Sequence, residues 1–263
     1  MNDFSKLIVK AVSIMILVLG MIACTSTQKV NEDAISKITN PQLKTTLNKV
    51  FDSMGGLENW QQLQSLKFKK KTILYLEDGQ IEKISDQQHH YEYKPVSKIH
   101  ISWKDAADRH LIQMTEEGVV KTVNQQIDAT ANLTALKNSV LAATFVIGVP
   151  FKIMDAGANL SYVGIETMNN GKEVHVVKAT YDPKNFEHHT KADIWWHYFD
   201  KDTYEQLGYA VQLHDHTSYI ENLTFERVGG FLFTTSRKSW RMNDKGEKLY
   251  VRAEYEYSDF EVR

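Results

Sequence analysis

The feature that most constrains the fold is a long succession of segments in which apolar and polar residues alternate, between residues 66 and 257. A period of two is that of a β-strand with one buried face. Short runs rich in Gly, Asn and Asp separate many of these segments and are typical of hairpin turns. They are residues 77–80, 116–118, 169–172, 200–203 and 243–246. Because hairpins join antiparallel neighbours, the sequence predicts one large antiparallel sheet, which should curl strongly.

An N-terminal helix is predicted from residue 40 onward. Asn40 is a favourable capping residue and Pro41 suits the first helical position. Apolar residues follow on one helical stripe, at Leu43, Leu47, Val50, Phe51 and Met54. Gly55 and Gly56 then end the helix, since glycine accepts a left-handed stop conformation. A short turn over residues 57–63 is expected next, with Trp60 closing one end of the core.

A second helix is predicted in residues 131–151, between the two strand-rich halves of the chain. Apolar residues fall there at helical spacing, at Leu133, Leu136, Val140, Leu141 and Phe145. Gly148 and Pro150 indicate that this helix ends near Ile147. The fold class predicted is mainly β with α: a large curved antiparallel sheet, forming an incomplete β-barrel, that wraps an apolar central helix and carries an N-terminal helix.

The N-terminus indicates where the protein resides. Residues 11–24 form an apolar run behind Lys6 and Lys10, and the run ends at Ala23 and Cys24. This arrangement is typical of a secretory signal peptide. Two alternatives are an uncleaved membrane anchor, although a spanning helix needs roughly 20 apolar residues, and an ordinary buried thiol at Cys24. The expected division is a lipoprotein signal peptide over 1–23, a flexible tether over 24–39 and a single half-barrel domain over 40–263.

Ile22, Ala23 and Cys24 also resemble a bacterial lipobox, in which the cysteine becomes the lipidated first residue of the mature protein. Cys24 is therefore the predicted lipid-attachment residue, and its several acyl chains would anchor the protein stably. Thr25 follows Cys24, and the resemblance to the sorting rule of enteric bacteria then implies the outer membrane. The expected location is the cell envelope, lipid-anchored at the outer membrane and facing the periplasm.

Composition and motifs argue against several classes of function. The chain has 31 Lys and Arg against 33 Asp and Glu, so a nucleic-acid partner is not expected. It has no Gly-x-Ser-x-Gly nucleophile motif and no phosphate-cradling glycine loop. We therefore expect no cofactor, no bound metal and no enzymatic activity. The alternative is a metal-dependent hydrolase using His214, His216 and another histidine, since His214 and His216 share a face if their segment is extended.

The segment 194–199 is aromatic on both of its alternating faces. Trp196 and Tyr198 lie on one face, and Trp195 and Phe199 lie on the other. A one-sided antiparallel strand would carry polar residues on one face. The strand is therefore either fully buried or turns one face toward a ligand cavity.

Together these features resemble those of uncharacterised envelope lipoproteins from Bacteroidota, which are similar to the lipoprotein-carrier superfamily of outer-membrane localisation factors. The residues concerned are the helix ending at Gly55 and Gly56, Trp60, the apolar helix followed by residues 149–151, and the strand and turn at residues 196–203. The resemblance implies an apolar concave face that holds acyl chains. A fixed lipid anchor also favours a receptor-like role over a shuttle.

Three hypotheses of function follow. The first is a lipid-anchored binding protein that holds a lipid or acyl group in a half-barrel groove. Its predicted ligand-binding residues are Leu141, Phe145, Phe151, Trp196 and Tyr198. The second is a structural or interaction protein with an envelope protein partner, in which the central helix is a fixed plug and no cavity is open. The third is the hydrolase. Replacing Phe145 or Phe151 by Asp should release ligand if the helix is a lid and unfold the domain if it is a plug.

Overall fold

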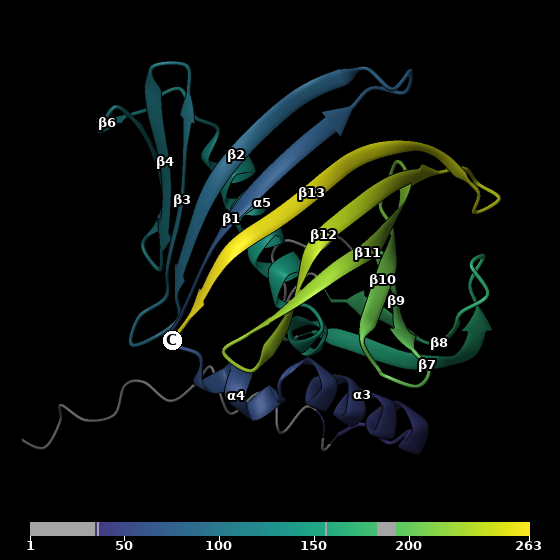
Figure 1. Cartoon of the computed structure of the whole chain (residues 1–263). Helices are drawn as coiled ribbons and strands as arrows, with labels where there is room; N and C mark the ends of the chain where they lie inside the picture. The colour runs from purple at the N-terminus through teal and green to yellow at the C-terminus, as the bar shows by residue number, and fades with distance from the viewer. Residues whose placement is uncertain (1–34, 36, 156, 183–192) are drawn as a thin grey trace, which may run out of the picture.

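The computed structural model describes residues 35, 37–155, 157–182 and 193–263 (Figure 1). The predicted signal peptide, the lipid-attachment residue Cys24 and most of the tether lie outside the described residues. They remain predictions, as does the single-domain assignment for residues 40–263.

One antiparallel sheet of 13 strands dominates the structure. The strands are β1 (Ser65–Tyr75), β2 (Ile81–Glu92), β3 (Lys98–Asp105), β4 (Asp108–Thr115), β5 (Gly118–Val123), β6 (Gln126–Ile127), β7 (Ala158–Thr167), β8 (Glu173–Tyr181), β9 (Ile194–Asp200), β10 (Gln206–Gln212), β11 (Thr217–Val228), β12 (Phe231–Met242) and β13 (Lys248–Val262). Every pairing is antiparallel, and the sheet curves without closing. The predicted open half-barrel is confirmed.

The order of the strands explains the architecture. It runs β6-β5-β4-β3-β2-β1-β13-β12-β11-β10-β9-β8-β7, so two meanders meet where the first strand pairs with the last. The edge strands, β6 and β7, are neighbours along the chain but lie at opposite ends of the sheet. The connection between them must therefore span the sheet. It contains α5 (Leu133–Gly148), which crosses the concave side (Figure 1).

Helix α5 begins and ends where the sequence indicates. Asn132 caps its start, and the Asn132 side-chain oxygen accepts a hydrogen bond from the amide of Ala135 at 3.0 Å. Its last residue, Gly148, lies one position beyond the predicted end at Ile147. A 3-10 turn, η1 (Phe151–Met154), follows and is buried at three of its four positions. The predicted central helix is confirmed.

Helices α3 (Pro41–Met54) and α4 (Leu57–Gln62) lie at one end of the half-barrel (Figure 1). The Asn40 side chain accepts from the amide of Leu43 at 3.0 Å, and Gly55 ends α3 with a φ of 122°. The five predicted apolar residues of α3 are all buried. The predicted helix, its cap and its glycine stop are therefore confirmed.

An aromatic cluster holds this end of the molecule together. Trp60 stacks on Phe151 with ring centroids 4.8 Å apart, and Phe51 stacks on the same ring at 5.8 Å. Phe231 meets Trp60 edge to face at 5.6 Å. Such pairs add to the free energy gained by burying the rings. Trp60 lies at an end of the core, as the sequence predicts.

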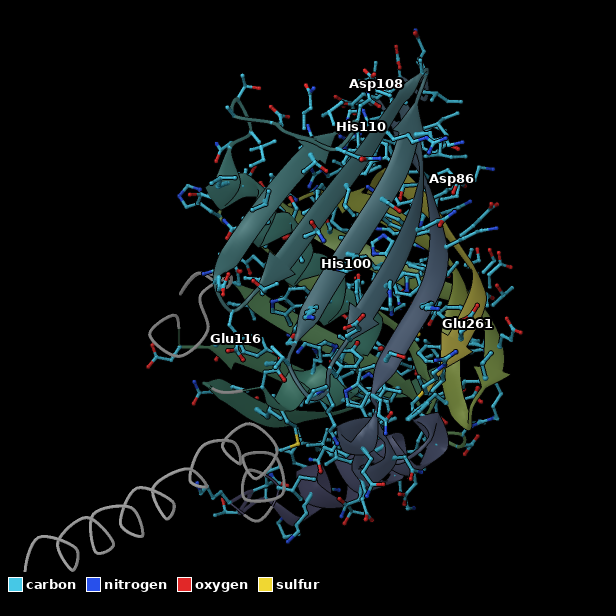
Figure 2. All side chains as sticks on the ribbon, turned by 90° about the vertical axis from the view of Figure 1, so that its left-hand side faces the viewer. Asp86, His100, Asp108, His110, Glu116 and Glu261 are labelled. Atoms are coloured by element: carbon cyan, nitrogen blue, oxygen red, sulfur yellow. The ribbon has the colours of Figure 1, made fainter. Side chains whose placement is uncertain are left out.

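The outer face of the sheet carries many charged and polar side chains on the side that Figure 2 shows. Three lysines of β1 alternate on that face and pair with carboxylates of β13 across the seam between the first and last strands. The pairs are Lys67 with Glu261 at 3.3 Å, Lys69 with Asp259 at 2.7 Å and Lys71 with Glu256 at 3.5 Å. Exposed pairs contribute little stability individually, but they match the observed register of the seam. Among the described residues, no helix has the length and apolar character needed to cross a bilayer.

Candidate ligand-binding groove

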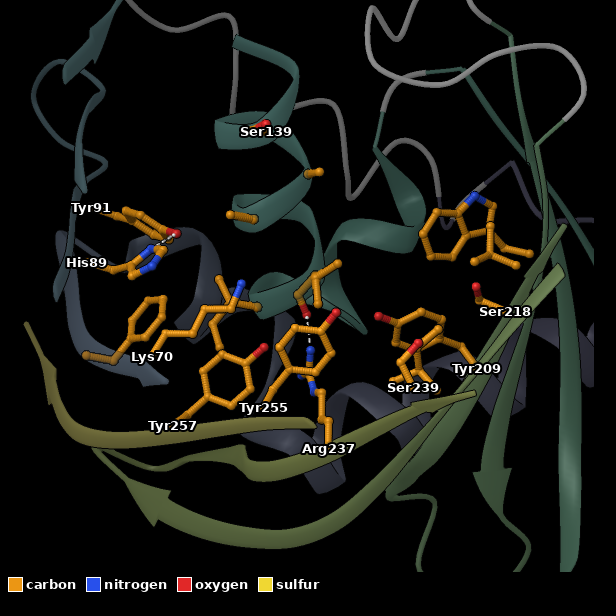
Figure 3. Close-up of a pocket in the computed structure, with 18 residues that line it drawn as sticks. Lys70, His89, Tyr91, Ser139, Tyr209, Ser218, Arg237, Ser239, Tyr255 and Tyr257 are labelled. Carbon is orange, nitrogen blue, oxygen red and sulfur yellow. Dashed lines mark hydrogen bonds between the residues drawn. The ribbon is translucent and has the colours of Figure 1, made fainter. Parts of the chain in front are cut away.

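A groove of about 400 Å³ lies between the concave face of the sheet and helix α5 (Figure 3). Strands β12 and β13 form its floor with Arg237, Ser239, Tyr255 and Tyr257. Strands β1 and β2 form one wall with Phe68, Lys70, His89 and Tyr91. Strands β9 to β11 form the other wall with Trp195, Tyr209, Val211, Ser218 and Ile220. Its size lies within the range of pockets that take small ligands.

One face of α5 covers the groove. Its lining residues are Ser139, Ala142, Ala143, Val146 and Ile147. The first four fall at i, i+3, i+4 and i+7, which places them on one side of the helix. Three of these four side chains are no larger than serine, so the helix passes over the sheet without filling the space beneath it. Ser139 and Ala142 are exposed, so the groove is open to solvent along this part of the helix.

The opposite side of the same helix is packed into the core. Phe145 is 1% exposed and meets the rings of Trp195 and Tyr181 edge to face, at 5.1 Å and 5.9 Å. Gly148 is buried as well. A Cβ built on Gly148 would lie 2.4 Å from the Lys152 side chain and 3.2 Å from Trp60. The C-terminal half of α5 is therefore fixed by close packing, whereas its N-terminal half is more exposed.

Two cationic side chains enter the groove from the floor and the wall. The sheet register pairs Lys70 of β1 with Tyr257 of β13, and Tyr255 of β13 with Arg237 of β12. Both cations are therefore on the concave face, on the two strands that flank β13. Lys70 Nζ lies 5.2 Å from the ring centroid of Tyr255, and the Arg237 guanidinium lies 5.2 Å from that of Tyr257. Each cation thus lies over the tyrosine that is paired with the other.

Arg237 is 3% exposed, and its Nη1 donates a hydrogen bond to the carbonyl oxygen of Val146 at 3.2 Å. That carbonyl belongs to the last turn of α5, where helix carbonyls lack intrahelical donors. The contact ties the floor of the groove to the helix (Figure 3). The Nε of Arg237 is buried and has no hydrogen-bond acceptor in the described part of the chain.

His89 and the tyrosines make the groove polar without adding negative charge at neutral pH. Burial is the main cause that lowers the pKa of His89 from its usual value to about 3, and nearby Lys70 acts in the same direction. Its Nδ1 lies 2.7 Å from the Tyr91 hydroxyl. Burial also raises the pKa of Tyr255 to about 12 and that of Tyr209 well above its usual value. His89 is therefore neutral and these hydroxyls keep their protons.

The five predicted ligand-binding residues do not line this groove. Leu141 is half-buried on α5, and Phe145 lies on the packed side of that helix. Phe151 belongs to the aromatic cluster with Trp60 and is 4% exposed.

Trp196 and Tyr198 belong to the outer face of β9. The concave face of that strand carries the buried residues Trp195, His197 and Phe199. On the outer face, Lys178 lies 5.8 Å from the Trp196 ring and Tyr219 lies 6.0 Å from the Tyr198 ring. Neighbouring long side chains therefore shield the second aromatic face, and the face on which Trp195 lies is the one that reaches the groove.

The histidines do not form a metal site in the described residues. No group of three or more His, Cys, Asp or Glu residues that could hold a metal ion occurs there. His214 is exposed, and His216 Nδ1 lies 2.6 Å from Asp215. His188 and His189 lie outside the described residues. Nothing in the described residues completes the pair at His214 and His216.

None of the groove-lining residues was predicted from the sequence, although the sequence contained a signal for the two charged ones, Lys70 and Arg237. Lys70 continues the alternation that carries Leu66 and Phe68, so it is a charged residue in the apolar register of its strand. Arg237 is likewise a charged residue at a buried position of β12, the strand on which Phe231 and Phe233 are also buried. A cation on the buried face of a strand is rare enough to mark a candidate site.

No family model matches the sequence, and no curated protein matches it. Among solved structures, a DUF1329 family protein from Desulfovibrio piger has a TM-score of 0.53 at 12% identity, over 84% of this chain and 93% of that one. A LolA superfamily protein from Nitrosomonas europaea has a TM-score of 0.53 at 10% identity, over 83% and 93%.

The chain shares its fold with these two proteins, one of which is a LolA superfamily protein. The resemblance to lipoprotein carriers that the sequence indicates is therefore confirmed at the level of the fold. The origin in Bacteroidota remains a prediction, since neither structure bears on it.

Proposed function

We propose that this protein binds an apolar ligand, a lipid or acyl group, in the groove beneath α5, and that it does so in the cell envelope without catalysing a reaction. The observation that carries the proposal is a hollow of about 400 Å³ on the concave face, beneath the face of α5 with its small side chains. Phe68, Val211 and Ile220 supply apolar walls, and burying apolar surface gains about 25 cal/mol per Å². The fold shared with a LolA superfamily protein supports the proposal.

The proposed site differs from the one that the sequence predicts. Ligand contacts are assigned to the groove-lining residues, with Ala142 and Ala143 on the helix and Trp195 on β9. Phe145 and Phe151 have a structural role, because they hold the end of α5 in place.

A fluorescent apolar probe without charge, N-phenyl-1-naphthylamine, tests the proposal. The protein should bind it with enhanced fluorescence. Ala143→Trp places an indole in the groove and should abolish the enhancement, whereas Asn138→Trp, on an exposed position of the same helix, should not. Equal fluorescence enhancement by the wild type and both variants would contradict the proposed site. Native mass spectrometry of protein isolated without detergent would identify a lipid that remains bound.

Lipid anchoring at Cys24 is part of the proposal and has its own test. Cells grown with a radiolabelled fatty acid should label the protein, and Cys24→Ser should remove the label. A labelled Cys24→Ser protein would contradict the anchor while leaving the groove unaffected.

The alternative of an interaction protein with a fixed plug rests on the packed half of α5, where Phe145 is 1% exposed. It predicts that the groove stays empty and that a protein partner binds elsewhere. Absence of probe binding by the wild-type protein would favour this alternative.

A further inference from the structure

We infer that the ligand of the groove is an amphiphile with an anionic head group, a carboxylate or a phosphate, and that Arg237 and Lys70 bind this group while the apolar walls hold its chain. The inference rests on the proposed function. It adds the charge of the ligand's head group and the residues that bind that charge.

The first observation is a buried cation without an anion. Arg237 is 3% exposed, yet among the described residues it forms no ion pair with any carboxylate. Its hydrogen-bond partners are neutral groups, the Val146 carbonyl and the Tyr209 side chain, and its Nε is buried without an acceptor in the described part of the chain. A buried charge is costly unless it is paired and hydrogen-bonded. A guanidinium has five N–H donors in a planar fork that matches a carboxylate or a phosphate.

The second observation is that Lys70 differs from its neighbouring lysines in the direction of its side chain and in its lack of an acidic partner. The flanking lysines of β1 point outward, and each is paired with a carboxylate of β13. Lys70 points inward, is half-buried and has no ion pair among the described residues. Arg252 and Lys238 likewise have carboxylate partners, Glu82 and Glu254. These neighbouring cations are paired with the chain's own acids, whereas neither groove cation has a carboxylate partner among the described residues.

The third observation is the composition of the lining. It contains both cations, three serines and four tyrosines, but no aspartate or glutamate. Burial keeps His89 neutral, with a pKa of about 3, and holds Tyr255 protonated, so neither side chain is charged at neutral pH. The groove is consequently electropositive in its middle and apolar at Phe68, Val211 and Ile220.

The geometry brings both cations to one place. Lys70 and Arg237 lie on the two strands beside β13 and are offset by two residues along it, so their backbones are about 12 Å apart. Both side chains rise from the sheet toward α5 (Figure 3). One head group between them would receive charge-assisted hydrogen bonds from both sides, above the rings of Tyr255 and Tyr257.

Competition against N-phenyl-1-naphthylamine tests the inference, with dodecanoate and dodecanol as ligands of equal chain length. Wild-type protein should prefer dodecanoate by about tenfold or more, as expected when charged hydrogen bonds are gained. Dodecyl phosphate should compete at least as well as dodecanol, and its ranking against dodecanoate identifies the preferred head group. Acetate and inorganic phosphate should not displace the probe, because they lack the chain.

Arg237→Met and Lys70→Met should each reduce the preference for the anion toward unity. Lys238→Met is the matched control, because Lys238 is adjacent to Arg237 but lies on the outer face, paired with Glu254 at 2.9 Å. It should retain the wild-type preference. Lys70 is half-buried, so its replacement tests the inference even if the Arg237 variant folds poorly.

Three results would overturn the inference. Equal competition by dodecanoate and dodecanol would show that the charge of the head group does not affect binding in the groove. Probe binding itself would still support the proposed function. If both methionine variants still prefer dodecanoate as the wild type does, Arg237 has only a structural role through its hydrogen bond to Val146. Displacement by acetate or inorganic phosphate as effective as that by dodecanoate would indicate a simple anion site. If the wild-type protein fails to bind the probe at all, the proposed function itself fails.

Discussion

Replacement of Phe145 by alanine should strongly destabilise the protein, because this side chain fixes the C-terminal half of α5 to the sheet. Phe145 is 1% exposed and makes edge-to-face contacts with Trp195 and Tyr181. A buried Phe→Ala change costs about 3–5 kcal/mol, through lost burial and the cavity left behind. Each aromatic pair is worth about 0.5–1.5 kcal/mol beyond burial, so we expect about 4–5 kcal/mol.

Urea unfolding followed by tryptophan fluorescence measures this cost, and a thermal scan should show a fall in Tm of about 8–20 °C, at about 2–4 °C per kcal/mol for a domain of this size. Leu133→Ala is the matched control on the same helix. Leu133 is 52% exposed, so its replacement should change the free energy of unfolding by about 0.5 kcal/mol or less.

If both variants have the same Tm to within about 2 °C, Phe145 is not part of a fixed core and α5 moves as a whole. The same burial changes the expected effect of Phe145→Asp and Phe151→Asp. A carboxylate at either position would be buried without a partner. We expect both variants to unfold, so that they report on the core and not on ligand release.

Three further predictions concern separate parts of the sheet. The pKa of His89 is 6.5 in its ordinary state and about 3 in the folded protein, so the unfolded chain binds more protons between these pH values. The free energy of unfolding should therefore fall as the pH is lowered through this window. His89→Gln should make that fall smaller in urea titrations, and a variant as acid-sensitive as the wild type would contradict the prediction. Gly208→Ala places a Cβ 2.3 Å from the carbonyl oxygen of Ile220 and should cost about 1–3 kcal/mol in the same assay, whereas a neutral change would mean that the strands separate easily. Trp196→Ser lies on the outer face and should leave probe binding within about twofold of wild type, corresponding to about 0.4 kcal/mol; a larger loss would return this residue to the ligand site.

Local chemistry made much of the fold predictable. Helix α3 begins after Asn40, whose side chain caps it, and ends at Gly55, whose positive φ suits glycine. Both effects depend on the residue types themselves. The hairpin turns are similarly local, and the antiparallel direction follows from them. The pairing of β1 with β13 was not predictable in this way, because no turn joins strands from opposite ends of the chain.

The site was less predictable, for a related reason. The alternation of β9 shows two aromatic faces but does not show which face is concave, because that depends on the curvature of the whole sheet. The alternation therefore places Trp195 and Trp196 on opposite faces without identifying the face that reaches the groove. The inward direction of Lys70 was visible in its register, but its lack of an acidic partner depends on β13, which is distant in sequence.

The sequence alone determined the period of the strands, the two main helices and their ends, and the similarity to lipoprotein carriers, because these depend on contacts within a few residues or on short motifs. The tertiary structure alone decided that α5 covers a groove, since the helix must connect edge strands at opposite ends of an open sheet. It also decided that Arg237 and Lys70 meet in that groove, because their approach depends on a register set by strands that pair across the length of the chain.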